Sequence, residues 1–93
     1  MQPITIEWVY KAEGDFATAE REFQVKDNPN YDGICFHCQQ CAEKYLKARL
    51  QEANIPFSKM HDLSALLDLT LAVEPNWNIL RGDLQLLSAF AVT

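Results

Sequence analysis

The stretch CFHCQQCAEKYLKARLQEA, residues 35–53, makes up most of a long helix that the sequence predicts from about Tyr31 to Ala53. Turn-forming residues bound this helix, with Asn28-Pro29 before it and Pro56 after it. The same stretch holds all three cysteines and one of the two histidines of the chain. Residues 35–53 therefore predict a helical fold and also contain the first candidate site.

Helices are predicted on both sides of this stretch. From Ile4 to about Val25, apolar residues recur every three or four positions, which indicates one face of an amphipathic helix. A third, shorter helix is predicted to begin at Ser58 or at His61-Asp62, and the proline of EPNWN ends it. A last helix is predicted to begin near Trp77. Four helices joined by short loops predict an all-α fold, an antiparallel up-and-down four-helix bundle.

The length and the apolar content fit one domain. The chain has 93 residues, 48% of them hydrophobic, so residues 1–93 are predicted to form a single helical domain. Residues 84–93, LQLLSAFAVT, are mainly apolar and carry no helix stop signal. We therefore expect the fourth helix to be truncated at its C-terminal end, with the C-terminal part of the domain missing. We also expect a homodimer, because a monomer rarely leaves such a surface exposed.

The charge of the chain limits its partners and its location. A formal net charge of -5 gives no overall positive field for phosphate polymers or anionic lipids, so any contact with nucleic acid must be local. The first twenty residues mix charges into every turn, which is typical neither of a signal peptide nor of a membrane span. The sequence thus predicts a cytoplasmic protein without membrane contact.

The cysteine cluster raises the question of a metal site. On a helix, Cys35, Cys38 and Cys41 spread over an arc of about 120 degrees, and His37 points away from them. A structural zinc site normally takes ligands from two separate sequence motifs, and a second motif is absent from this sequence. A redox CxxC motif belongs at a helix N-terminus, not inside a helix. We predict no metal and no cofactor, with the cysteines filling small buried positions.

Two quoted segments carry a family resemblance. FHCQQCAEKYLKARL, residues 36–50, followed by IPFSKMHDLSALL, residues 55–67, closely resembles the HEPN domain family. In that family the second helix carries a pattern like F-H-x-Q-Q-x-A-E-K-x-L-K-A, and the third helix starts at an H-D-L. The resemblance also implies four main antiparallel helices.

The resemblance implies two alternative functions. Many HEPN proteins resemble metal-independent ribonucleases, whose active site is an arginine followed a turn or two later by a histidine, duplicated across a dimer. Others are toxins encoded beside a small nucleotidyltransferase, their antitoxin. Here a histidine follows none of Arg21, Arg49 and Arg81 at that spacing, so we expect any such pair outside these 93 residues. The alternative is a non-catalytic nucleotide-binding protein or companion subunit of the nucleotidyltransferase.

A polar row on the predicted second helix forms the candidate binding site. Steps of three and four relate most of its members, which are His37, Gln40, Glu43, Lys44 and Lys47. In one interpretation the row borders a dimer cleft and holds a nucleotide or RNA phosphate, with Lys44 and Lys47 as the charge donors. In the other it is a solvated face with a Glu43–Lys47 pair, and His37 is a buried, hydrogen-bonded histidine.

Asp62 and the large aromatic residues are predicted to have structural and not functional roles. Asp62 is predicted to cap the third helix. The large aromatic residues are predicted to pack in the core and not to stack on bases. These residues are Trp8, Phe16, Phe23, Phe36, Tyr45, Phe57, Trp77 and Phe90.

Overall fold

The computed structural model describes residues 1–90, and within them it is built of helices and loops without a β-strand. The elements are α1 (Pro3–Phe23), α2 (Tyr31–Glu52), α3 (Leu63–Thr70), a 3₁₀ helix η1 (Pro75–Leu80) and α4 (Arg81–Ala89). The predicted all-α fold with four helices is confirmed, and α4 is short. The predicted truncation of the fourth helix concerns residues 91–93, which lie outside the described part of the chain.

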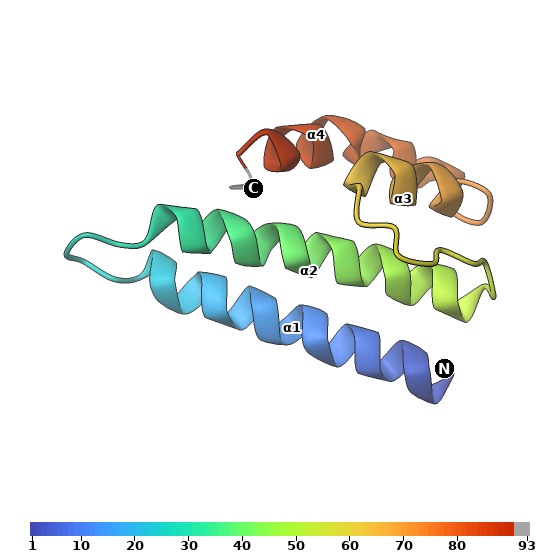
Figure 1. The fold of residues 1–93 in the computed structure, drawn as a ribbon, viewed down its shortest axis with the longest axis horizontal. Helices are drawn as coiled ribbons and strands as arrows, with labels where there is room; N and C mark the ends of the chain where they lie inside the picture. Colours follow the sequence, from blue (N-terminus) through green and yellow to red (C-terminus); the bar gives the residue numbers. More distant parts are fainter. Residues whose placement is uncertain (91–93) are drawn as a thin grey trace.

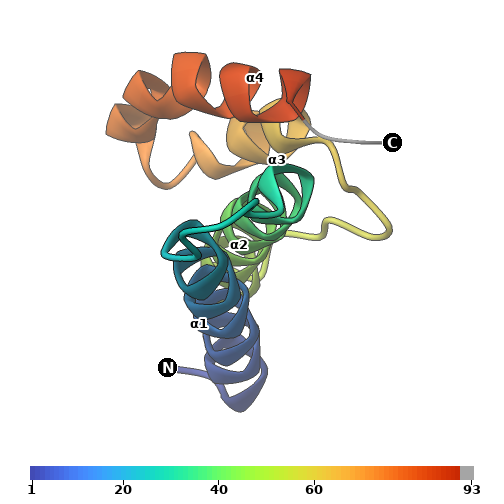
Figure 2. The same ribbon diagram turned by 90° about the vertical axis from the view of Figure 1, so that its left-hand side faces the viewer.

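The helices are arranged around α2. Figures 1 and 2 show α1 along one side of α2 and the α3–η1–α4 segment on the other. The first two helices form a long antiparallel hairpin, and α2 also contacts α3 and α4. Within residues 1–90, α1 contacts no helix other than α2. Side chains of α2 can therefore meet partners on two sides, whereas α1 is covered along one side only.

The contact of α1 with α2 uses small side chains. Thr5, Ala12 and Ala19, which recur every second turn, are the buried residues of α1. The predicted apolar face of this helix is therefore only partly buried, since Phe16 and Phe23 remain 55% and 71% exposed. A helix that packs on a single neighbour buries a narrow strip, and larger side chains beside that strip stay in contact with solvent.

The aromatic residues depart from their predicted role in the same way. Trp8, Phe57 and Trp77 are half-buried, which agrees with packing. The other five residues are between 42% and 71% exposed, so the prediction that they pack in the core is wrong for them. Those five are Phe16, Phe23, Phe36, Tyr45 and Phe90.

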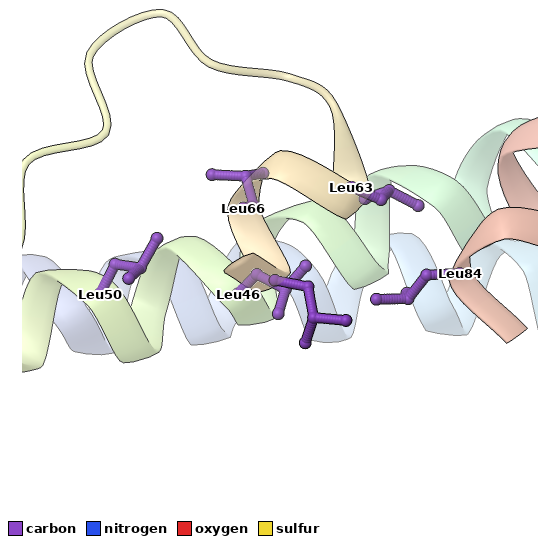
Figure 3. Packing of buried hydrophobic residues seen from close by; sticks show 6 residues of the cluster. Leu46, Leu50, Leu63, Leu66 and Leu84 are labelled. Carbon is purple, nitrogen blue, oxygen red and sulfur yellow. The ribbon is translucent and has the colours of Figure 1, made fainter. Parts of the chain in front are cut away.

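The hydrophobic core lies between α2 and the C-terminal helices. Leu46 and Leu50 of α2 meet leucines of α3 and α4, as Figure 3 shows. Leu66 and Leu67 of α3 are 0% exposed, and Leu84 of α4 closes the cluster. This burial is the main attraction that holds α3 and α4 on α2.

Local signals set the ends of the middle helices. The side chain of Asn30 accepts a hydrogen bond from the backbone N–H of Gly33 at 2.9 Å, which caps α2. The side chain of Asp62 accepts one from the backbone N–H of Ser64 at 2.9 Å, so the predicted cap of the third helix is confirmed. Both caps satisfy a backbone donor that the first helical turn leaves free.

The last helix begins later than predicted. Trp77 lies within η1, and the α-helical segment starts only at Arg81. Pro75 starts the segment, and Asn76 and Asn78 favour turn conformations over a regular α-helix. Asn78 also accepts a hydrogen bond from Nε of Arg81 at 3.0 Å, which stabilises the junction between the two helical segments.

Replacing Asp62 with alanine should lower the unfolding free energy by about 1 kcal/mol, because the first turn of α3 loses its cap. Chemical denaturation followed by circular dichroism measures this change. Asp62→Asn is the matched control, because asparagine caps helices as well as aspartate does. Equal stability of Asp62→Ala and the wild type would show that the cap contributes nothing.

Candidate functional site

The polar row predicted on the second helix lies on α2 and divides into two clusters. The Asp15 cluster consists of Asp15 from α1 with His37 and Lys44. The Glu43 cluster consists of Glu43 and Lys47 with His61 from the loop before α3. Gln40 is half-buried and stands one turn from either cluster along α2. The structure thus adds two residues to the candidate site, Asp15 from α1 and His61 from the loop before α3.

In the Asp15 cluster one carboxylate serves two partners. Its Oδ1 lies 2.8 Å from Nδ1 of His37, and its Oδ2 accepts a hydrogen bond from Nζ of Lys44. With the proton on Nδ1, His37 donates to Asp15 and keeps the lone pair of Nε2 for another partner. The side chains of His37 and Lys44 are 32% and 22% exposed, against 12% for Asp15. The cluster ties α1 to α2 and leaves part of each basic group in contact with solvent.

The electrostatics of Asp15 favour its ionised form. Burial acts to raise the pKa of this carboxyl, but the hydrogen bonds from Lys44 and His37 outweigh burial and hold the pKa below its ordinary value of 3.8. A carboxyl whose pKa is lower in the folded state stabilises the fold above its unfolded pKa. The stabilisation is lost as the pH falls through the folded pKa.

Asp15→Asn should therefore lower the unfolding free energy at neutral pH and remove part of its pH dependence below pH 3.8. The wild type should lose stability steeply in that range, because Asp15 takes up its proton on unfolding. Denaturation series at several pH values measure both effects. Parallel pH curves for the two proteins would contradict this role of Asp15.

In the Glu43 cluster a lysine and a glutamate are enclosed together. Nζ of Lys47 lies 2.9 Å from Oε2 of Glu43, and the two side chains are only 6% and 7% exposed. The ammonium also lies 5.5 Å from the ring centre of Trp8 and 5.9 Å from that of Phe57. The predicted Glu43–Lys47 pair is present, but it is buried and not solvated. Lys47 is thus surrounded by a carboxylate and two aromatic rings.

His61 is the exposed member of this cluster. Its Nδ1 lies 3.0 Å from Oε2 of Glu43 and 3.5 Å from Nζ of Lys47, yet its side chain is 72% exposed. Since Glu43 fixes one ring nitrogen, the other can face a ligand from solvent. The Glu43–Lys47 pair can therefore act as a support that positions His61.

The two clusters give this part of the surface a balanced charge. Lys44 and Lys47 compensate Asp15 and Glu43, while the protein as a whole carries a net charge of -5. Both histidines of the chain lie here, and each adds a positive charge when it is protonated. A phosphate group is therefore repelled less at this face than by the protein on average.

The three cysteines lie on α2 as free thiols. Cys41 is buried, as predicted, but Cys35 and Cys38 are only half-buried. Burial, reinforced by Cys35, raises the pKa of the Cys38 thiol, and burial with nearby Asp15 raises that of Cys41. Protonated thiols are poor nucleophiles and poor metal ligands. Among residues 1–90, no three His, Cys, Asp or Glu side chains are grouped to hold a metal ion.

The sequence offers little signal for the two added residues. Asp15 is one of several acidic residues on a charged helix, and only the pairing of α1 with α2 brings it to His37 and Lys44. His61 precedes the cap of α3, so its position next to a helix start conceals its contact with Glu43. Two features of the sequence could have pointed to these residues. His61 lies just before a capped helix, and Asp15 lies beside the buried residues of α1.

The comparison with protein families decides the classification. The family model of the HEPN domain matches residues 5–93, which is nearly the whole chain. The chain belongs to the HEPN domain family.

Comparison with curated proteins and with solved structures gives no significant match for this HEPN chain. HEPN domains commonly resemble ribonucleases, and they often dimerise or pair with a partner protein. None of the helices described within residues 1–90 is long and apolar enough to cross a membrane. In this HEPN chain, His37 belongs to the polar row of α2, and His61 contacts the row through Glu43.

Proposed function

We propose that this HEPN chain acts on RNA as the toxin of a toxin–antitoxin pair, cleaving RNA without a metal ion and neutralised by a small nucleotidyltransferase. The observation that carries the proposal is the family match over residues 5–93, because ribonuclease-like activity is common in that family. In this proposal residues 1–93 belong to a single HEPN domain that acts in the cytoplasm, where its RNA is found.

The polar row of α2 is the proposed contact face for RNA or nucleotide. Its residues are His37, Gln40, Glu43, Lys44 and Lys47, with Asp15 and His61 added by the structure. Direct contacts come from the partly exposed groups, which are the two imidazoles and the ammonium of Lys44. Glu43 and Lys47 are buried and position His61. The balanced charge of this face supports the assignment.

The cleavage step needs a group that can transfer a proton and a cation that stabilises the phosphate. HEPN ribonucleases use an arginine and a histidine for this purpose, and no arginine of this sequence is followed by a histidine at the required spacing. We therefore assign no catalytic pair within these 93 residues. A homodimer is part of the proposal, since apolar side chains of the C-terminal segment such as Ile79 and Phe90 are exposed on the single chain.

Expression of the full-length gene in a bacterial host tests this function. The proposal expects growth arrest and RNA decay with the gene alone, and rescue when the nucleotidyltransferase gene beside it is co-expressed. The purified protein should cleave RNA in the presence of a chelator. Unimpaired growth together with intact RNA would overturn the ribonuclease proposal.

The second candidate is a non-catalytic nucleotide-binding protein or companion subunit of the nucleotidyltransferase. The missing arginine–histidine spacing in this sequence favours it. It predicts intact RNA and harmless expression, together with a complex between the two purified proteins. Co-purification without RNA cleavage would support this candidate over the toxin.

A further inference from the structure

An apolar groove runs along the α1–α2 hairpin on the side of α1 that carries Phe16 and Phe23. The groove has a volume of about 260 Å³, and its lining is formed by Phe16, Ala19, Glu20, Phe23, Ile34 and Cys38. Phe16 and Phe23 stand two turns apart on α1 and are more than half exposed. The buried residues of α1 are Thr5, Ala12 and Ala19, so Phe16 and Phe23 lie at the exposed edge of the contact with α2.

Two acidic side chains lie in or near this groove. Glu20 lines it directly, and Glu13 stands two turns earlier on the same side of α1. Glu13 acts on Tyr45 of α2, where it adds to the effect of burial in raising the pKa of the phenol. Glu13 and Glu20 therefore lie on the same side of α1 as Phe16 and Phe23.

These two acids also differ from the carboxylates that form salt bridges in the described chain. No lysine or arginine lines the groove, and within residues 1–90 neither Glu13 nor Glu20 forms a salt bridge. By contrast, Asp15, Glu43, Asp68 and Glu74 each lie against a basic group. The groove thus combines apolar side chains with negative charge that has no partner in the described chain.

We propose that this groove binds a basic amphipathic helix of a partner protein. The apolar side chains of that helix would lie between Phe16 and Phe23, and its lysines or arginines would face Glu13 and Glu20, as in other helix-in-groove complexes. RNA and anionic lipid are repelled by the two acids. A second copy of this chain would bring the same acidic surface against the groove, which disfavours that occupant. The proposal is independent of RNA cleavage.

A pair of synthetic peptides tests the proposal. One is a short helical peptide with leucines on its apolar face and lysines on its polar face, and the other carries glutamates in place of the lysines. Fluorescence anisotropy should show saturable binding of the lysine peptide that weakens with added salt. The glutamate peptide should bind at least about tenfold more weakly. Equal affinity for the two peptides would overturn the proposal.

Variants locate the binding on the protein. Glu13→Lys/Glu20→Lys should weaken binding of the lysine peptide by about tenfold or more. The control Glu7→Lys/Asp83→Lys changes the net charge equally outside the groove and should leave the affinity unchanged.

The apolar side chains of the groove are tested separately. Phe16→Ser/Phe23→Ser should abolish binding of the lysine peptide. Tyr10→Ser should leave it unchanged, because Tyr10 lies outside the groove on α1 and is 78% exposed. Circular dichroism verifies that each variant is folded.

Two results would contradict the proposed occupant. If Glu13→Lys/Glu20→Lys binds the lysine peptide as well as the control does, the acids do not select the partner. If Phe16→Ser/Phe23→Ser changes the molar mass of the protein in light scattering, the groove is covered by a second copy. Protection of Cys38 from a thiol reagent by the lysine peptide, measured in a Cys35→Ala background, should confirm the place of binding.

Discussion

Replacing Glu43 with glutamine should lower the unfolding free energy by about 3 kcal/mol, because the change leaves the ammonium of Lys47 buried without a counter-charge. The two side chains are 6% and 7% exposed, and the aromatic rings of Trp8 and Phe57 limit the access of water to Lys47. Urea denaturation followed by circular dichroism measures the loss.

Two controls separate burial from charge. Asp68→Asn removes the carboxylate of the Arg81–Asp68 pair, in which Asp68 is 63% exposed, and should lower stability by less than about 1 kcal/mol. The double variant Glu43→Leu/Lys47→Met should recover most of the stability lost in Glu43→Gln, since apolar groups can replace a buried ion pair. If Glu43→Gln and Asp68→Asn lose the same small amount, the Glu43 cluster does not act as a buried support.

The other large effect is expected in the leucine core. Leu66→Ala should lower the unfolding free energy by about 2 to 5 kcal/mol, because it removes a fully buried side chain between α3 and α2. The matched control is Leu86→Ala on α4, which is 58% exposed and should change stability by less than about 0.5 kcal/mol. The same denaturation experiment compares the two. Similar losses for both variants would mean that α3 is not held by this core.

The leucine core also positions a residue of the candidate site. His61 lies two residues before α3, and α3 is held on α2 by Leu63, Leu66 and Leu67. Packing of α3 thus fixes the distance between His61 and Glu43. A partly loosened Leu66→Ala protein should consequently also lose affinity for RNA, without any change to a residue of the contact face.

The helices could be predicted well because their signals are local. The predicted and observed bounds of α2 differ by one residue at the C-terminal end, since Asn28-Pro29 and Pro56 mark the ends in the sequence itself. The cap by Asp62 follows from the same kind of local signal. The late start of α4 escaped prediction, because a proline such as Pro75 can stand in the first turn of an α-helix as well as in that of a 3₁₀ helix.

The site could be predicted only in part, because its contacts join different helices. Helical spacing placed Lys44 and Lys47 on one row and suggested two cations for phosphate. The structure pairs both with carboxylates, and one of these, Asp15, comes from α1. Which residue of α1 meets a given residue of α2 depends on the register of the two helices, and hydrophobic periodicity does not specify that register. The same limit explains why Phe16 and Phe23 were expected inside.

We propose that this HEPN chain acts on RNA through the face formed by the Asp15 and Glu43 clusters. A titration of fluorescent single-stranded RNA with the wild type and with His37→Ala/His61→Ala tests it most directly, because these changes remove the two partly exposed imidazoles and leave both lysine–carboxylate pairs in place. We expect saturable binding by the wild type that weakens with salt, and affinity at least about tenfold lower for the folded double variant. Equal affinity of the two proteins, or no saturable binding by the wild type, would contradict it.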